Sequence, residues 1–406
     1  MNGQPSDVQQ PDYRTFDIAG SHAQLGFALG LADPPFQKQF WWSPPPHPAF
    51  AAACRDAVHD VHPHVLDEFD AYADAQRLNV RTLWQQCCRV NLKARVRLPQ
   101  EPWAVASSPD GLEGSTEGCS TFVHYLNCAQ GQDQGQYAVI IGRNYDYLPQ
   151  QMRRQRIRFA PDYGALASIG ARGGVPCGRY DGLNTHGLFA SLHVVMTSTP
   201  DEDDVKPGVP FHLIVRIALE ICHTAREAAE LVARLPHLSS LNYLIADTRE
   251  AFVVEADPRR VRVIERGASD IGGTGPPPQR PCGPFEGLGV PDRDSIGRVL
   301  AATNHFRHPD MRSLQGSRAS SNSACRLSFL SSPVRLSSAS FEPCQFTDAL
   351  LKQAEHIMAD RTTPVCGTDG ALTTLWSCVA ELTTKRIRYA AGAPGVVPFE
   401  ELSWTA

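Results

Sequence analysis

Two short apolar segments separated by a polar loop predict a β-hairpin in the first half of the chain. The first segment follows a Gly-Cys pair, Gly118 and Cys119, and begins with residues 121–123. The second, residues 137–141, ends in a Gly-Arg-Asn-Tyr-Asp cluster, and the loop between them, residues 127–136, is rich in Gly and Gln. Apolar, β-branched segments bounded by Gly, Asn and Asp are typical of paired strands. The hairpin would bring a thiol near an arginine and a carboxylate, groups that nucleophilic catalysis uses.

Cys119 is a candidate nucleophile if something removes its thiol proton. A thiol attacks poorly until a base takes that proton or a cation stabilises the thiolate, and the chain has no histidine in a recognisable cysteine-protease signature. Cleavage of the peptide bond before Cys119 would supply a base, because an α-amino group has a pKa of roughly 7.7–8.0. Gly118 suits this reaction because glycine tolerates unusual backbone geometry. The thiol would form a thioester with the Gly118 carbonyl and be released by water, and Thr121, on the same face of the strand, could assist.

Three segments, taken in order, resemble one protein family. Residues 118–121, 142–146 and 302–305 resemble the acyl-coenzyme A:6-aminopenicillanic acid acyltransferase family of N-terminal-nucleophile (Ntn) amide hydrolases, which is distantly related to the choloylglycine hydrolases. Singly these motifs are weak, but in this order they are specific. The resemblance covers most of the chain, including three further segments: residues 18–30, 182–188 and 208–220.

The resemblance implies a fold and a maturation step. Strands cluster after Cys119 with helices around them, so the sequence alone allows an α+β layered domain. The resemblance sharpens this to the Ntn-hydrolase four-layer αββα sandwich of two antiparallel sheets. It also implies self-cleavage into a short chain, residues 1–118, with an N-terminal strand and a helical segment, and a catalytic long chain, residues 119–406. Residues 99–117 are rich in Pro, Ser and Gly, as expected of an accessible processing site.

The resemblance also suggests roles for individual residues. Cys119 would be the nucleophile rather than a structural thiol, and Asp146 would orient or stabilise the new α-amino group rather than serve only as a turn carboxylate. Arg143 would hold the thiolate or a substrate carboxylate. Asn304 would donate to the oxyanion, a contact that typically contributes about 10²–10³ in rate; a turn asparagine is the alternative.

Further residues are candidates for the pocket wall. His193 lies where related enzymes offer a second polar contact to the oxyanion. Asn144 and Tyr145 belong to the cluster at the end of the hairpin, although Asn144 is more typical of a structural turn residue. His305, beside Asn304, is more typical of a packing residue.

The sequence departs from the penicillin acyltransferase at two places. Residues 369–373 lack the Ser-Arg pair that precedes the late strand of that enzyme, and Asp257 stands where its Glu-x-Ser-Pro turn has serine. Both positions assist self-cleavage in that enzyme. The departures predict a family member with a different substrate and leave the efficiency of cleavage open.

Composition excludes several other classes. The chain has 406 residues, a formal charge of −5 and a charged fraction of 20%, which is typical of a soluble globular protein and unsuited to phosphate-backbone binding. It has no apolar segment near the ~20 residues of a membrane span and no signal-peptide pattern at residues 1–7. The twelve cysteines are scattered, so reduced thiols and a cytoplasmic location are expected. The expected partner is a small-molecule substrate, with neither nucleic acid nor membrane, and a homo-oligomer is compatible with the sequence.

Motifs for metals, phosphates and serine nucleophiles are weak or missing. Residues 62–64 read His-Pro-His, but no carboxylate or further histidine at helical spacing would complete a zinc site. The chain has neither a phosphate-binding P-loop nor a Gly-x-Ser-x-Gly elbow. No cofactor or metal is therefore predicted.

Apolar periodicity predicts the remaining elements. A strand is expected at residues 13–18, a helix at 23–31, and helical structure over 49–97 with an Asn79 cap before its second helix. The other expected strands and helices are the strands 166–169, 178–183 and 188–195, the helix 211–235, the hairpin 241–255, the strands 260–264 and 300–303, the helices 323–330 and 347–358, and the hairpin 373–389.

These observations favour a self-processing cysteine amidase that acts on linear amide bonds through an acyl-enzyme on Cys119. The alternatives are an acyltransferase, in which an amine resolves the acyl-enzyme after transfer from an acyl-coenzyme A or amide donor, and a binding protein that keeps the fold without catalysis. A zinc protein built from the scattered Cys and His is the least favoured class.

Overall fold

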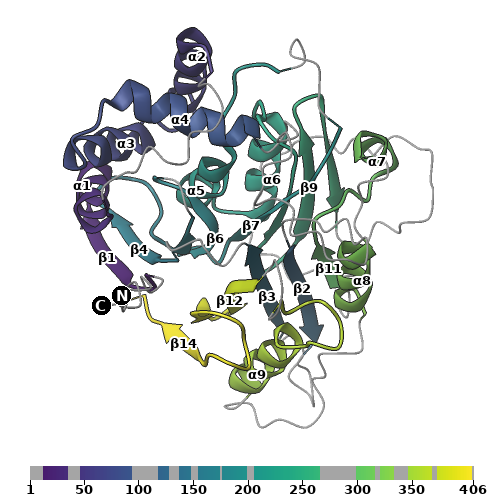
Figure 1. The fold of residues 1–406 in the computed structure, drawn as a ribbon. Coiled ribbons are helices and arrows are strands. Elements are labelled where there is room, and N and C mark those ends of the chain that lie inside the picture. Colours follow the sequence, from purple (N-terminus) through teal and green to yellow (C-terminus); the bar gives the residue numbers. More distant parts are fainter. Residues whose placement is uncertain are drawn as a thin grey trace, which may run out of the picture.

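The computed structural model describes most of the chain (Figure 1). The described residues are 12–34, 46–93, 118–127, 137–147, 154–173, 176–198, 205–265, 299–315, 321–332, 346–367 and 373–404. The predicted processing linker at residues 99–117 lies outside them.

The described strands form two sheets. The larger has the order β1-β4-β5-β6-β7-β8-β9-β10 and the smaller has the order β11-β2-β3-β12-β13-β14. The strands are β1 (Thr15–Gly20), β2 (Gly118–Asn127), β3 (Tyr137–Tyr147), β4 (Arg156–Pro161), β5 (Ser168–Arg172), β6 (Arg179–Asn184), β7 (Phe189–Val194), β8 (Leu241–Ala246), β9 (Ala251–Asp257), β10 (Arg260–Glu265), β11 (Val299–Ala302), β12 (Thr373–Glu381), β13 (Arg386–Ala390) and β14 (Phe399–Leu402).

Strand pairing in both sheets is antiparallel, with one exception. β1 pairs with β4 in parallel, Thr15 opposite Arg156, which the prediction of two antiparallel sheets did not include. A parallel pair needs a long crossover between its strands, and here the chain supplies one through the N-terminal helices and the β2–β3 hairpin.

The described helices lie on the outer faces of the two sheets or beside them. They are α1 (His22–Ala32), α2 (Pro48–His59), α3 (His64–Ala75), α4 (Val80–Lys93), α5 (Phe211–Ile221), α6 (Ala225–Arg234), α7 (Pro309–Gln315), α8 (Ser321–Leu330) and α9 (Phe346–Met358). α5 and α6 pack on the larger sheet, α8 and α9 pack on the smaller one, and the sheets meet through β2, β7, β8, β9 and β11. The αββα sandwich is therefore confirmed, with α1–α4 grouped beside α5 (Figure 1).

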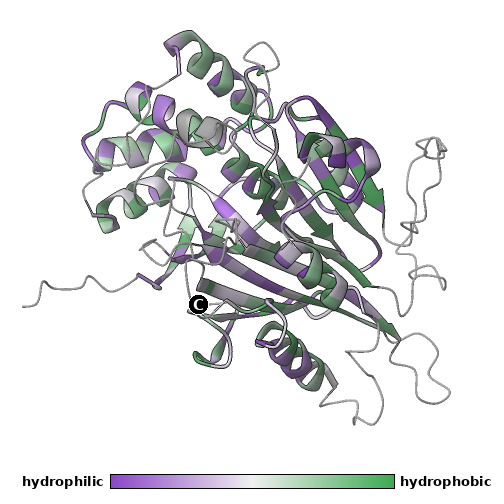
Figure 2. Ribbon diagram, turned by 45° about the vertical axis from the view of Figure 1, so that its right-hand side comes forward, coloured by the Kyte–Doolittle hydropathy of each residue, from purple (hydrophilic) through white to green (hydrophobic). Residues whose placement is uncertain are grey.

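Side chains of the hairpin alternate between two cores. Cys119, Val123 and Tyr125 belong to the core between the sheets, whereas Phe122 and Leu126 pack with apolar residues of α9. Successive side chains of a strand point to opposite faces, so the alternation fixes which face each residue of β2 presents. In Figure 2 the helices present both apolar and polar sides, as expected for an outer layer.

The sequence before Cys119 is built into the same sandwich as the sequence after it. β1 forms the edge of the larger sheet, and buried ion pairs link Asp33 to Arg172 and Glu68 to Arg216. The predicted short chain is thus not a separate folding unit in this structure.

Two predicted helices are divided. The segment before the Asn79 cap forms α2 and α3, separated at residues 60–63. Instead of a single helix over residues 211–235, α5 ends at Ile221 and α6 begins at Ala225. Thr224 accepts a hydrogen bond from the Glu227 backbone N–H and forms a capping box with it, a Thr-x-x-Glu signature that the sequence analysis missed. The predicted Asn79 cap is confirmed by its bond to the Thr82 N–H, 3.1 Å.

Within the described ranges, no helix combines the length and hydrophobicity that crossing a bilayer requires.

Candidate active site around Cys119

The predicted hairpin is formed by β2 and β3, and its register sets which residues lie opposite one another. Gly118 lies opposite Asp146, Cys119 opposite Tyr145, and Thr121 opposite Arg143. Paired residues share a face, so the side chains of Cys119, Thr121, Arg143 and Tyr145 all lie on the face between the two sheets. Asp146 lies on the other face, toward the outer helices.

The backbone of Cys119 is held by two side chains from distant segments. Its N–H donates to Asn304 Oδ1 at 2.7 Å, and its carbonyl accepts from Arg326 Nη1 at 2.5 Å. Arg326 Nη2 also donates to Asn304 Oδ1 at 3.0 Å. Because two donors converge on this atom of Asn304, it must be the oxygen, and the amide nitrogen is the atom that donates to the Val194 carbonyl at 2.9 Å.

Arg326 is a site residue that the sequence analysis missed. It projects from α8, is 1% exposed, and also donates to Ser120 Oγ at 2.9 Å. Burial lowers the pKa of Arg326, while the charges of Asp146 and Cys119 oppose that shift. The helix was predicted, but a lone arginine in it has no local sequence signal that marks it as buried.

Thr121, Arg143 and His193 form a polar group between the sheets. Arg143 Nη1 donates to Thr121 Oγ1 at 3.1 Å, and His193 Nε2 lies 2.8 Å from the same oxygen. Because His193 Nδ1 faces the Asn242 carbonyl at 3.2 Å, Nδ1 carries the proton and Nε2 accepts one from Thr121. Burial and then the charge of Arg143 hold the pKa of His193 well below its usual range, so the ring is a neutral acceptor.

Arg143 is fixed by Asp181, a second residue that the sequence analysis missed. Arg143 Nε donates to Asp181 Oδ2 at 2.8 Å, and Trp376 Nε1 donates to the same oxygen at 2.8 Å. The Tyr389 hydroxyl donates to Asp181 Oδ1 at 2.9 Å. Burial disfavours the charge on Arg143, but Asp181 and then Cys119 raise the pKa of its guanidinium overall. Arg143 therefore stays a cation.

Asp146 lies against the residue that precedes Cys119. A Cβ on Gly118 would lie 3.0 Å from Asp146 Oδ2, so glycine leaves room for the carboxyl group. Burial raises the pKa of Asp146 to about 7, against the lowering effects of Arg326 and of the Thr374 hydrogen bond. The Thr374 hydroxyl donates to Asp146 Oδ1 at 2.6 Å.

The structure brings Tyr145 to this face and leaves Asn144 on the other. The Tyr145 ring stacks on Trp376, with centroids 4.0 Å apart and planes 6° apart. Asn144 Nδ2 instead donates to the carbonyls of Met358 and Val365, both at 2.8 Å. Its side chain therefore ties β3 to α9 and the turn after it.

The side-chain contacts of His305 are with hydroxyl groups. Its Nδ1 lies 2.8 Å from Ser323 Oγ, the hydroxyl that also accepts from the Asn304 N–H at 2.9 Å. This agrees with the packing role expected for His305.

A family comparison places this geometry among known proteins. The sequence profile of the acyl-coenzyme A:6-aminopenicillanic acid acyl-transferase family matches residues 132–395, more than half of the chain. The chain belongs to this family. No curated protein matches it.

Several solved structures are similar to this family member. One is the N-acylethanolamine-hydrolyzing acid amidase ortholog of Caenorhabditis elegans, with 13% identity over 64% of this chain and 92% of that chain and a TM-score of 0.40. Another is penicillin V acylase from Agrobacterium tumefaciens, with 16% identity over 67% and 83% and a TM-score of 0.39. A third is a mutant of the conjugated bile acid hydrolase from Clostridium perfringens, with 15% identity over 70% and 92% and a TM-score of 0.36.

One of the two departures from the penicillin acyltransferase can be located in this family member. Asp257 ends β9, accepts from Ser240 Oγ at 2.6 Å and pairs with Arg259 Nε at 2.7 Å. The Arg259 and Ser240 hydrogen bonds keep the pKa of Asp257 low despite its burial. Residues 369–372 of the other departure lie outside the described residues.

Proposed function

We propose that this protein is a self-processing cysteine amidase in which Cys119 becomes the N-terminal nucleophile. Family membership supports an amidase or acyltransferase, and the contacts of Cys119 support the choice of nucleophile. The observation that carries the proposal is the pair of backbone contacts at Cys119: Asn304 Oδ1 holds its N–H at 2.7 Å and Arg326 holds its carbonyl at 2.5 Å.

In the proposed self-cleavage, Cys119 Sγ attacks the carbonyl carbon of Gly118. The S–C bond forms, the C–N bond breaks, and the thiol proton passes to the nitrogen, which becomes the α-amino group of Cys119. Water then hydrolyses the thioester, leaving a carboxyl group on Gly118 and restoring the thiol. Asn304 Oδ1 already accepts from this nitrogen and would keep the new amino group in place.

Thr121 would act as a positioning residue in that step. Its hydroxyl donates to His193 Nε2 and accepts from Arg143 Nη1, so the proton of the hydroxyl has a fixed direction. Thr121 lies two residues after Cys119 on the same face of β2. Buried, neutral His193 gives this part of the site a proton acceptor without adding a positive charge beside Arg143.

In the proposed turnover, the α-amino group takes the thiol proton and Sγ attacks the carbonyl carbon of an amide. The positive charges of Arg143 and Arg326 support the thiolate, since both lie within electrostatic reach of Cys119. The Asn304 amide nitrogen carries two protons, and one of them donates to Val194; Asn304 would use the other for the oxyanion. The α-ammonium group then protonates the leaving amine, and water releases the acid.

An acyltransferase would share every step up to the acyl-enzyme. An acceptor amine in place of water would attack the thioester carbonyl, and the thiol would leave in the same way. The family name supports testing this outcome beside hydrolysis.

The test is capture of the acyl-enzyme. The wild-type protein is mixed with a panel of linear amides and acyl-coenzyme A esters, and the mass of its Cys119-containing chain is recorded within seconds of mixing. A mass increase equal to the acyl group, seen in the wild type and absent in Cys119→Ala, supports the proposal. Turnover that survives Cys119→Ala would refute it.

A further inference from the structure

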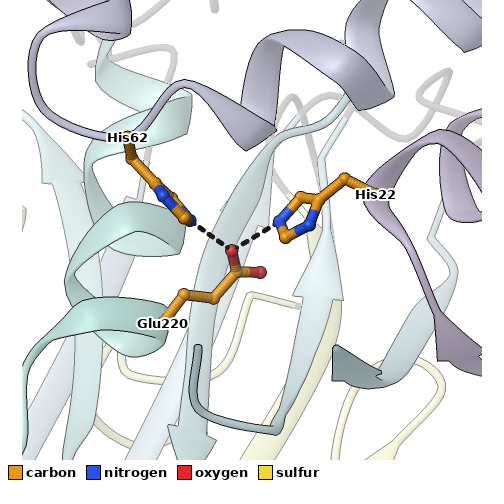
Figure 3. A group of neighbouring side chains, drawn as sticks. All are labelled: His22, His62 and Glu220. Atoms are coloured by element: carbon orange, nitrogen blue, oxygen red, sulfur yellow. Dashed lines mark hydrogen bonds and ion pairs between the residues drawn. The ribbon is translucent and has the colours of Figure 1, made fainter. Parts of the chain in front are cut away.

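A second buried cluster lies outside the candidate active site and contains His22, His62 and Glu220 (Figure 3). His22 is the first residue of α1, His62 lies in the turn between α2 and α3, and Glu220 lies near the end of α5. The three side chains are at most 5% exposed. The fold brings His22 and Glu220, which lie far from His62 in the sequence, next to it.

The ligand atoms of this cluster converge on one point. His22 Nε2 lies 2.8 Å and His62 Nε2 lies 2.9 Å from the same oxygen, Glu220 Oε2. All three atoms lie within 4.8 Å of one another. In tetrahedral zinc sites with bonds of about 2.0–2.2 Å, neighbouring ligand atoms are ~3.3 Å apart, so small side-chain shifts would open room for an ion.

The carboxylate is oriented by its other oxygen. Arg216 Nε donates to Glu220 Oε1 at 2.6 Å, and Arg216 in turn pairs with Glu68 Oε2 at 2.5 Å. With the Arg216 guanidinium bound to Oε1, Oε2 is the oxygen directed at both imidazoles.

His22 also has the outer partner that a metal-bound imidazole needs. The Tyr163 hydroxyl lies 2.8 Å from His22 Nδ1. A neutral imidazole that binds metal through Nε2 carries its proton on Nδ1 and donates it to such an oxygen. If Nε2 of His22 binds a metal, the ring proton must be on Nδ1. The Tyr163 hydroxyl already lies within hydrogen-bond distance of Nδ1 and can accept it.

A surface hollow of about 440 Å³ reaches one side of the cluster, where His22 and Tyr163 form part of its wall. Acidic residues of α3 line the same hollow: Asp67, Asp70 and Asp74. Asp70 pairs with Arg55 at 2.7 Å, and the carboxylates of Asp67 and Asp74 add negative charge that favours cations near the hollow.

We propose that His22, His62 and Glu220 bind one divalent transition-metal ion, with Zn²⁺ as the fitting occupant. Two imidazoles and one carboxylate suit zinc, with a water as the fourth ligand. Because the histidines precede Cys119 in the chain and Glu220 follows it, the ion clamps the N-terminal helices to α5. If self-cleavage occurs, the same ion joins the two chains.

The test is a metal titration of the full-length protein after chelator treatment and dialysis. Zinc is expected to bind one ion per chain by calorimetry and to raise the melting temperature as its concentration increases. Cobalt at the same site should give the visible absorption of a tetrahedral nitrogen–oxygen site, without the near-ultraviolet band of a cobalt–thiolate bond. That band would assign the ion to cysteines and overturn the proposal.

Matched variants separate metal binding from hydrogen bonding. His62→Gln and His22→Gln keep an N–H donor near the position of Nε2 but remove the ligand, so zinc affinity should fall by about 100-fold or more. His64→Gln is the control, because His64 lies beside the cluster, with its ring centroid 6.1 Å from that of His62, and contributes no ligand. Equal zinc binding by all three variants, or no zinc binding by the wild type, would overturn the proposal.

Discussion

Two buried clusters in this protein use similar residues in different ways. Near Cys119, Asp181 accepts from Arg143, Trp376 and Tyr389, so its oxygens are occupied. His193 is left to accept a hydroxyl proton from the strand that carries the thiol.

In the second cluster the imidazoles converge on the carboxylate itself. His22 and His62 both contact Glu220 Oε2, while Arg216 takes the other oxygen. In the first cluster His193 accepts a proton from Thr121 of β2. In the second, side chains from α1, the α2–α3 turn and α5 meet at Glu220 Oε2. His193 faces a hydroxyl group, whereas His22 and His62 face a carboxylate, so the second cluster offers three converging ligand atoms.

The largest expected effect separates Cys119 from the other buried thiols. Cys119→Ala should lower turnover by roughly 10⁴-fold or more, because removing a nucleophile disables the whole catalytic unit. Cys378→Ala is the matched control: Cys378 is also buried and lies opposite Arg143 in the same sheet. The measurement is the turnover rate of both variants on one amide substrate. Similar losses of rate in the two variants would show that Cys119 is not the nucleophile.

Asn304→Ala should lower kcat by about 10²–10³, because an oxyanion donor is lost. Asn144→Ala is the control, since Asn144 is also buried but donates to backbone carbonyls on the far face of β3. The control should lose about 1–3 kcal/mol of stability with an unchanged kcat. A normal kcat in Asn304→Ala would show that another group binds the oxyanion.

Asp181→Ala should lower the free energy of unfolding by about 3–5 kcal/mol, because it leaves Arg143 as an uncompensated buried charge. Glu230→Ala, which breaks the exposed pair with Arg234, should change it by less than ~1 kcal/mol. Urea denaturation of both variants measures the difference. Equal, small changes would mean that Arg143 finds another anion.

The smallest effect concerns the pH dependence of stability. The pKa of Asp146 is about 7 in the folded protein and about 3.9 when unfolded. Between these values the folded state binds more protons, so this group makes stability fall as pH rises. Urea unfolding of the uncleaved Cys119→Ala protein from pH 4 to pH 8 should therefore show that adding Asp146→Asn gains stability relative to Cys119→Ala alone as pH increases. Parallel curves for the two proteins would contradict the raised pKa.

The sequence predicted the parts of the site that lie on one hairpin. Thr121, Arg143 and Tyr145 share a face with Cys119 because strand alternation and a short loop determine the register. Asn304 came from the family resemblance.

The remaining site residues depend on contacts between distant segments. Arg326 reaches Cys119 across 207 positions, and Asp181 reaches Arg143 across 38. His22 and His62 meet Glu220 across 198 and 158 positions, and no local spacing encodes such a meeting. Asn144 shares the end of the hairpin with Tyr145, but its side chain lies on the other face of β3, where it donates to backbone carbonyls.

The most direct test of the central claim is the intact mass of freshly purified protein beside its Cys119→Ala variant. Wild type should yield two chains, residues 1–118 and 119–406, and the variant should yield one uncut chain. A single uncut chain in both proteins would remove the α-amino base and contradict the proposed mechanism. Cleavage in both proteins would show that Cys119 is not the group that cuts the chain.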